Sequence, residues 1–461
     1  MVAPSRALLN ARAPGCSRST SSATVEGASD RRSPSMGSNT AEPVGTAAPG
    51  ADEVRAPGVL EQRGVEFVGY HDLAGRPGFK MAMQRHGDRW YLYLGHLWHR
   101  GWSVLDVTDP RSPTLCRFLE GPADTWTIQV QVADGRMVTA LEKPNEGWGI
   151  EPGRPFEEGA YIWDVAHDPE DPQLLGHWRT GGTGTHRNFY AGGDLAYMTA
   201  NPEGYVGHLL AVVDIGDPAH PTEVGRWWWP GQHVAGGEKP EHDFYLHGPA
   251  YVVDGRAYLG YGRVGMVILD VEDPTDPRLV GRVSFGDLGS MLGCHSAVPL
   301  PGRDLVVANS EAILEGDGDP VNYTCVVDIA DEAHPRIIST FPMPRPEPGA
   351  PYDSYYAKGG RFGPHNQHQH QGHPDLAIPD DQIVMAYFNA GLRVFDIADP
   401  YVPVETGWYV PEDPPERRGT LPSTLVTQFE DVLVDARGYI YCTDKNHGLF
   451  VLRTTGEGTR P

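Results

Sequence analysis

The chain has 461 residues, and 61 acidic against 37 basic side chains give it a formal net charge of −24 when histidine is neutral. Such an acidic chain suits the phosphate backbone of nucleic acids poorly, so we expect no nucleic-acid partner. Glycine (56) and proline (42) are abundant, yet 11 Trp, 20 Tyr and 13 Phe remain to build a core. This combination is typical of short strands joined by many turns.

Residues 1–57 form the first segment of the chain. They contain no aromatic residue and no lysine, and Ser, Ala, Pro, Gly and Thr dominate them. Because such a segment buries too little apolar surface to order itself, we expect a disordered N-terminal extension, and residues 456–461 as a disordered C-terminal tail. A targeting segment is the alternative for residues 1–57, although the apolar run at residues 7–10 is short for a secretory signal.

No stretch of the sequence approaches the roughly 18 consecutive apolar residues of a membrane span. We therefore expect a soluble, cytoplasmic protein with no membrane partner.

From residue 58 to residue 455 the chain repeats one phrase, a short β-branched apolar run followed by Asp-(Val/Ile)-x-Asp-Pro or a close variant. Seven copies at intervals of 50 to 68 residues indicate a repeat architecture. The Asp and Pro predict an Asx-type turn after each run. The runs end at Asp106, Asp164, Asp214, Asp270, Asp328 and Asp396, and a degenerate last copy occupies residues 448–452.

Each copy carries the pattern of four short strands, which is the pattern of a propeller blade. We therefore predict an all-β fold in which residues 58–455 form one seven-bladed β-propeller. Residues 65–71 resemble the fourth strand of a unit without its first three, and the last copy stops at Leu452 without a fourth strand. The N-terminal strand can thus complete the last blade and remove both free sheet edges, which favours a closed ring over an open solenoid.

The recurring phrase resembles the LVIVD-repeat family of bacterial β-propellers over essentially all of residues 59–455. The segments 184–188, 246–250 and 358–366 are similar to phrases of one subgroup of that family. The resemblance implies the propeller fold but no settled reaction, so the function has to be inferred from the site.

The histidines are the most informative polar residues. When the units are aligned on their repeat aspartates, His186, His247 and His295 fall at one equivalent position at the start of the first strand, which lines the channel of a propeller. The next unit offers several histidines within residues 363–373, where insertions leave the alignment open. We favour His368 as the fourth member; the alternates are His365, His370 and His373.

Neutral imidazoles from neighbouring blades predict a mononuclear metal site on the propeller axis. Its expected cofactor is one divalent transition metal, with Fe(II) favoured over Zn, Mn or Cu. Glu430 occupies the equivalent position one blade on, and we expect it to orient a ligand or to move a proton. Asp243 and Glu311 are weaker carboxylate candidates.

Two arginines lie near the candidate site in the sequence. Arg361 follows two glycines that allow close backbone approach, and it is a candidate to hold a carboxylate of the substrate. Arg187 follows His186 directly, and strand alternation predicts that its side chain points to the opposite face.

These features favour a metal-dependent enzyme, most simply an Fe(II) oxidoreductase or oxygenase that acts on a small organic substrate, because imidazole ligands leave open coordination positions. A metal-dependent hydrolase or lyase is the alternative within the same class. A non-catalytic protein-interaction scaffold is the alternative outside it, and it predicts a protein partner and no bound metal.

Overall fold

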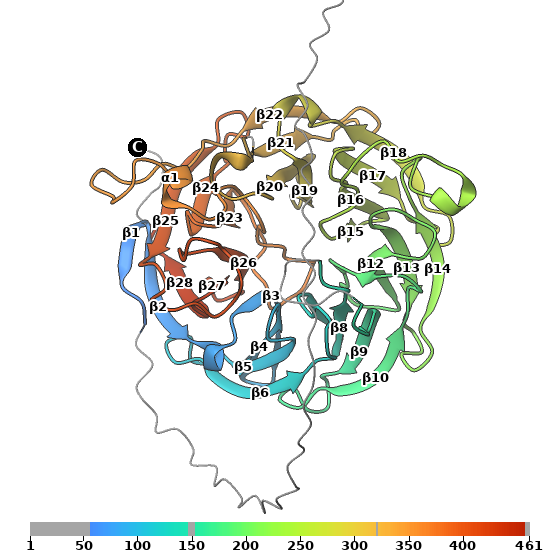
Figure 1. Ribbon diagram of the computed structural model, residues 1–461, viewed down its shortest axis with the longest axis horizontal. Helices are drawn as coiled ribbons and strands as arrows, with labels where there is room; N and C mark the ends of the chain where they lie inside the picture. Colours follow the sequence, from blue (N-terminus) through green and yellow to red (C-terminus); the bar gives the residue numbers. More distant parts are fainter. Residues whose placement is uncertain (1–55, 146–152, 320, 457–461) are drawn as a thin grey trace, which may run out of the picture. The chain divides into compact units, whose positions relative to one another are not determined.

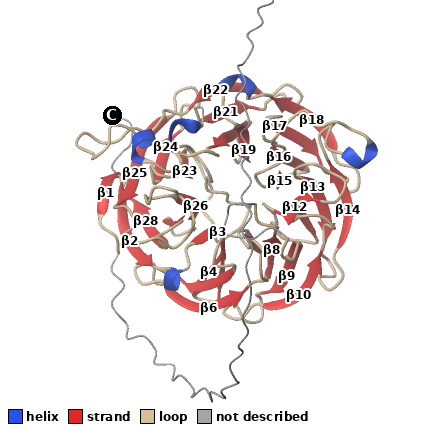
Figure 2. Cartoon of the chain, viewed as in Figure 1, coloured by secondary structure: helices blue, strands red, loops and turns tan. Residues whose placement is uncertain are grey.

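Six of the seven repeated apolar runs lie in buried strands that end at the repeat aspartate, and the last run lies in a strand that ends at Thr454. The computed structural model describes residues 56–145, 153–319 and 321–456, so nearly all of the predicted extension at 1–57 and of the tail at 456–461 lies outside the described residues. The described residues form seven four-stranded antiparallel sheets arranged as blades around an axis (Figure 1). Strands and the loops between them make up almost all of the ring (Figure 2). The predicted all-β, seven-bladed propeller is confirmed.

The first five blades, numbered in chain order, each use four consecutive strands. Blade one holds β3 (Gly78–His86), β4 (Arg89–His96), β5 (Gly101–Asp106) and β6 (Thr114–Glu120), and blade two holds β7 (Val130–Ala133), β8 (Arg136–Leu141), β9 (Gly159–Asp164) and β10 (Gln173–Trp178). Blade three holds β11 (Gly184–Thr185), β12 (Leu195–Asn201), β13 (Leu209–Asp214) and β14 (Thr222–Trp227). Blade four holds β15 (Tyr251–Val253), β16 (Arg256–Gly260), β17 (Met266–Asp270) and β18 (Arg278–Val283), and blade five holds β19 (Leu292–Pro299), β20 (Leu305–Glu311), β21 (Thr324–Asp328) and β22 (Arg336–Thr340).

The last two blades are each completed by a strand from the beginning of the propeller. Blade six joins β1 (Val59–Arg63) to β23 (Gln382–Ala386), β24 (Leu392–Asp396) and β25 (Val404–Pro411). Blade seven joins β2 (Val65–His71) to β26 (Phe429–Val434), β27 (Tyr439–Asp444) and β28 (Leu449–Thr454). The pairing of β2 with β28 is the one that the sequence predicts, whereas the pairing of β1 with β25 was not predicted. Both outer edges are thereby covered.

Short helical turns interrupt the loops between strands. They are α1 (Tyr355–Lys358) and the 3-10 turns Leu73–Gly75, Val234–Gly236, Gly286–Leu288 and Gly316–Gly318. Within the described ranges, no helix is long and apolar enough to span a lipid bilayer.

The repeat aspartates form the predicted Asx turns. In each of six blades the carboxylate accepts a hydrogen bond from the backbone N–H two residues further on, which fixes the sharp exit from the buried strand. The bonds are Asp106 to Thr108 (2.8 Å), Asp164 to Ala166 (2.8 Å), Asp214 to Gly216 (2.8 Å), Asp270 to Glu272 (3.0 Å), Asp328 to Ala330 (2.9 Å) and Asp396 to Ala398 (2.9 Å).

The core lies between neighbouring blades, where the apolar faces of adjacent sheets pack together. One such cluster joins Met266 and Ile268 of blade four to Val306 and Val327 of blade five. Burying one side chain of this size contributes about 1.5–3 kcal/mol, so the repeated packing between blades supplies most of the stability of the ring.

Substitutions in β2 test whether this strand completes blade seven. Val65 is fully buried among blades six and seven, whereas Phe67, two residues along the same strand, is 37 % exposed. We expect Val65→Asp to lower the free energy of unfolding by about 3 kcal/mol or more, because it buries a carboxylate without a partner. Phe67→Asp is the matched control and should cost less than about 1 kcal/mol in urea denaturation. Equal losses for the two variants would contradict the position of β2.

Candidate metal centre

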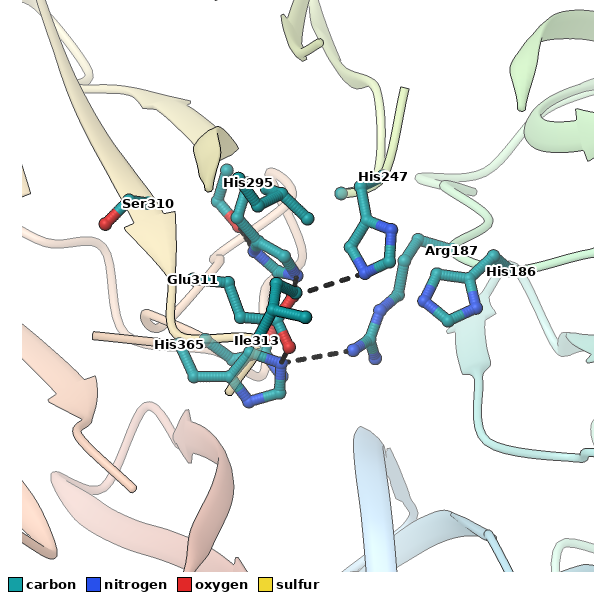
Figure 3. Close-up of polar contacts among 12 residues, drawn as sticks. His186, Arg187, His247, His295, Ser310, Glu311, Ile313 and His365 are labelled. Carbon is teal, nitrogen blue, oxygen red and sulfur yellow. Dashed lines mark hydrogen bonds and ion pairs between the residues drawn. The ribbon is translucent and has the colours of Figure 1, made fainter. Parts of the chain in front are cut away.

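Four histidines from four successive blades meet at the propeller axis (Figure 3). His186, His247, His295 and His365 belong to blades three, four, five and six. The ring centroids of neighbouring histidines lie 4.5 Å apart for His186 and His247, 5.3 Å for His247 and His295, and 5.0 Å for His295 and His365. The three histidines predicted to share a position therefore come together, and His365 is the fourth.

The backbone explains why these rings meet. In blades three, four and six the histidine N–H donates to the strand that pairs with the aspartate-bearing repeat strand, namely β12, β16 or β23. The accepting residue always lies four residues after the one that pairs with the repeat aspartate. In blade five, the register of β19 shifts between Leu292 and Ser296, and His295 lies in that irregular segment. The bonds are His186 N–H to Thr199 O (2.9 Å), His247 N–H to Gly260 O (3.2 Å) and His365 N–H to Ala386 O (3.0 Å).

Glu311, at the end of β20, brings a carboxylate to the histidines. Its Oε2 atom lies 3.2 Å from His247 Nε2 and 3.6 Å from His295 Nε2. The ligand atoms of these three residues all lie within 4.8 Å of one another. Atoms bound to one ion at about 2.1 Å are roughly 3–3.5 Å apart, so the three side chains could hold a metal ion with small adjustments.

Other side chains orient the histidine rings from outside the cluster. A carboxylate or hydroxyl lies at Nδ1 of three rings, which directs Nε2 inward, as in metal sites where an outer carboxylate holds a ligating histidine. The Nε2 atoms of His186 and His295 and the Oε2 atom of Glu311 are buried without a hydrogen-bond partner. The outer distances are His186 Nδ1 to Glu142 Oε2 (2.5 Å), His295 Nδ1 to Ser296 Oγ (2.6 Å) and His365 Nδ1 to Glu430 Oε2 (3.4 Å).

The buried histidines are held in their neutral form. Burial lowers the pKa of His186 to about 3, although Glu142 opposes the shift. Burial also holds the pKa values of His295 and His365 well below the usual range, against the effect of Glu311. Neutral imidazoles offer a lone pair, which is the form that binds a metal ion.

Glu311 is held in its ionised form. Burial alone would raise its pKa, but His365 and His247 bring it well below the usual range. Arg361 Nη1 lies 2.9 Å from Glu311 Oε1 and also donates to Ala312 O at 3.2 Å. The carboxylate that Arg361 holds in this structure is therefore one of the protein's own.

Glu430 lies where the sequence predicts it, next to the histidine of the preceding blade. The register of β26 shifts between Phe429 and Asp431, which leaves Glu430 at the inner edge of the sheet. Lys445 Nζ lies 2.6 Å from its Oε1 atom. Burial raises the pKa of Glu430 in spite of Lys445, and burial lowers the pKa of Lys445 in spite of Glu430.

The preference for His368 over His365 needs correction. His368 lies three residues after His365, in the segment that precedes β23, where its N–H donates to Val384 O at 2.9 Å. Its Nε2 donates to Ala377 O at 2.7 Å and its Nδ1 accepts from Val434 N–H at 3.1 Å, so backbone groups engage both ring nitrogens. The alternates His370 and His373 also lie apart, since their Nδ1 atoms accept from Gly372 N–H (3.0 Å) and Asp375 N–H (3.2 Å).

Arg187 also departs from the sequence-based expectation. Strand alternation does not apply to it, because β11 ends at Thr185. Its guanidinium group lies beside the cluster, with Nη2 3.3 Å from His365 Nε2 (Figure 3). Asp243, by contrast, is exposed and has no place among these residues.

Glu142 was not among the predicted site residues, and Glu311 was predicted only as a weaker carboxylate candidate. Both lie six residues after the residue that pairs with the repeat aspartate, Arg136 in blade two and Leu305 in blade five. Aligning the second strands, and not only the first, would have revealed two carboxylates at one equivalent position. Glu142 also lies 2.9 Å from His208 Nε2 through its other oxygen, and the two histidines hold its pKa below the usual range although burial opposes this.

Comparison with known proteins supports the fold. The family model for the LVIVD repeat matches residues 204–227 and 250–284, which cover β13 and β14 and then β15 to β18. No curated protein matches the chain. The solved structure of U3-55K is 8 % identical with a TM-score of 0.51 and covers 86 % of this chain and 100 % of that one. The RRP9 WD40 repeats are 10 % identical with a TM-score of 0.51 and cover 87 % of this chain and 99 % of that one.

A double-mutant cycle tests the pairing of Arg361 with Glu311. We expect Arg361→Met to lower the free energy of unfolding by about 3–5 kcal/mol, because it leaves a buried carboxylate without its cation. Adding Glu311→Leu should restore most of that loss. Chemical denaturation of the two single variants and the double variant measures the coupling.

The ion pair of Arg303 with Asp381 is the matched control, since it has the same N–O distance of 2.9 Å but lies partly in solvent. Its coupling should stay below about 1 kcal/mol. Equal coupling free energies in the two cycles would contradict the expectation that burial strengthens the Arg361–Glu311 ion pair.

Proposed function

On a chain that carries LVIVD repeats and folds as a seven-bladed propeller, consistent with the LVIVD-repeat propeller family, we propose a metal-dependent enzyme with one divalent transition metal on the propeller axis. One observation carries the proposal: His247 Nε2, His295 Nε2 and Glu311 Oε2 converge within 4.8 Å. His186 and His365 flank these three residues and complete the ligand candidates.

The donor set fits such an ion. Two imidazoles and one carboxylate form the set that non-haem Fe(II) oxygenases use on one face of the metal, and the same set also holds catalytic zinc. We keep Fe(II) as the first candidate and Zn as the second. When bound, iron(II) supplies redox chemistry with dioxygen, whereas zinc would supply the Lewis-acid chemistry of the alternative hydrolase or lyase. The elemental identity of the metal separates these two activities.

The protein's own residues supply positioning and proton transfer. Glu142 and Ser296 hold the rings of His186 and His295 by Nδ1, which keeps their Nε2 atoms directed at the axis. Glu430 lies 3.4 Å from His365 Nδ1. Glu430 has a raised pKa and is buried, so it can hold a proton beside His365 and is the candidate acid or base. The His247 side chain keeps 22 % of its surface exposed, which provides access for a small organic substrate.

The scaffold remains the second candidate, because the fold alone is shared with proteins of many functions. It requires no metal and gives no reason for three histidines, Glu142 and Glu311 to occupy equivalent positions in their blades. Metal content distinguishes the two candidates.

Elemental analysis of the full chain, purified without a metal-binding tag and reconstituted anaerobically, tests the proposal. We expect about one equivalent of a single transition metal, since the donors surround one position. His247→Ala, His295→Ala and Glu311→Gln should each abolish stoichiometric binding while circular dichroism reports an intact fold. Absence of stoichiometric metal in the wild-type chain would overturn the metalloenzyme and leave the scaffold.

The pair His365→Ala and His368→Ala tests which histidine belongs to the centre. Because backbone groups engage both ring nitrogens of His368, we expect His368→Ala to keep its metal even if the melting temperature falls. His365→Ala should lose at least tenfold in metal affinity. The reverse result would restore His368 as the fourth ligand.

Glu142→Gln tests the outer carboxylate. Glutamine keeps the shape of the side chain but removes the charge that orients His186. We expect metal affinity to fall about 10- to 100-fold, measured by competition with a chelator, because outer carboxylates of ligating histidines contribute by this amount. An unchanged affinity would remove His186 from the ligand set.

A further inference from the structure

Arg187 and Arg393 are the two arginines among the largest fully buried side chains in the described part of the chain. Their hydrogen-bond partners differ. Arg187 is 2 % exposed, and Arg393 is not exposed at all. The three guanidinium nitrogens of Arg393 all have partners: Nε donates to Ala390 O at 2.8 Å, Nη1 lies 3.2 Å from Glu405, and Nη2 donates to the hydroxyl of Tyr355. Of the nitrogens of Arg187, Nη2 alone has one, at His365.

The Nε and Nη1 atoms of Arg187 are buried without a hydrogen-bond partner. Leaving buried donors unpaired is destabilising, and more so for a charged group than for a neutral one. In native proteins a bound water, an ion or a ligand usually completes such groups. The unpaired donors of Arg187 therefore point to a missing acceptor.

The neighbouring cations do not share this deficit. Arg361 is paired with Glu311, Lys445 with Glu430, and Lys80 with Asp431 at 2.8 Å. Arg187 makes no ion pair with a carboxylate in the ranges that the structure describes. Burial lowers the pKa of Arg187, and Glu311, Asp431, Glu430 and Glu142 oppose that shift. Arg187 therefore lacks a hydrogen-bond acceptor at Nε and Nη1 rather than nearby negative charge.

The position of Arg187 defines where that partner binds. Its guanidinium group lies between the rings of His186 and His365, next to the candidate metal ligands (Figure 3). On its other side it stacks over Phe79 at 4.7 Å from the ring centroid. Phe79 packs with Leu97 and Trp126, so the surroundings combine a cation with an apolar wall.

We propose that Arg187 binds the carboxylate of the substrate, so that the enzyme acts on a small organic acid. A carboxylate accepts hydrogen bonds from Nε or Nη1, and guanidinium groups suit its planar geometry. A metal ion beside Arg187 would place two positive groups together in a buried site, which an anionic substrate relieves. The substrate class rests on the proposed function, whereas the anion site at Arg187 rests on the described residues alone.

Calorimetric titration of the full, metal-loaded chain with benzoate tests the proposal. Benzoate combines a carboxylate with an aromatic ring that can pack against Phe79, and benzamide is its neutral counterpart. Acetate is a smaller carboxylate, which tests whether only small anions reach Arg187. We expect benzoate or acetate to bind at least tenfold more tightly than benzamide, and Arg187→Gln to weaken that binding at least tenfold. Arg187→Lys, which keeps the charge, should lose less.

Arg393→Gln is the matched control, because it also removes a fully buried guanidinium group, but in blade six and away from the axis. Its carboxylate binding should equal that of the wild type. Thermal unfolding and metal content of each variant separate a loss of the site from a loss of the fold. If Arg187→Gln failed to fold, Arg187→Lys would carry the comparison.

Three results would overturn the proposal. They are equal binding of benzoate and benzamide with no binding of acetate, carboxylate binding that Arg187→Gln leaves unchanged, and tighter binding of inorganic phosphate than of either carboxylate. Repeating the titration on metal-free protein separates this proposal from the metal centre. If no metal binds, carboxylate binding that depends on Arg187 still supports the anion site, and its absence overturns it.

Discussion

The site depends on one backbone constraint, the hydrogen bond by which the histidine segment of a blade attaches to the neighbouring strand. In blades three, four and six that bond falls at the same step of the ladder, so equivalent residues meet at the axis. A single-residue slip in a strand would turn each side chain to the opposite face. The cluster therefore depends on how the segments just outside the regular strands attach to the neighbouring strand.

Charge compensation is the second requirement that the axis imposes. Four acidic groups, Glu142, Glu311, Glu430 and Asp431, lie buried near one another. Such charges are tolerated when a cation or a hydrogen-bond donor is within reach. Each of them has a basic side chain or a histidine next to it. Within this network the Nε2 atoms of His186 and His295 are the inward nitrogens that keep no hydrogen-bond partner.

The repeat made the fold and part of the site predictable from the sequence. Residues at one position of a repeat share one position in the ring, so His186, His247 and His295 could be grouped without coordinates. The fourth histidine could not be placed, because the irregular segment before β23 breaks the count and puts His365, not His368, at the axis. Arg187 was misplaced because alternation was assumed where the strand had already ended.

The two strands that precede the first blade have a consequence for how the ring forms. β2 pairs with β28 through Val65 and Thr454, and β1 pairs with β25 through Arg63 and Trp408. These contacts join residues from nearly opposite ends of the described chain, and such non-local pairings form slowly because the intervening chain must be ordered first. Because β1 and β2 precede β25 and β28 in the chain, these two pairings cannot form until the strands of the last two blades have been synthesised.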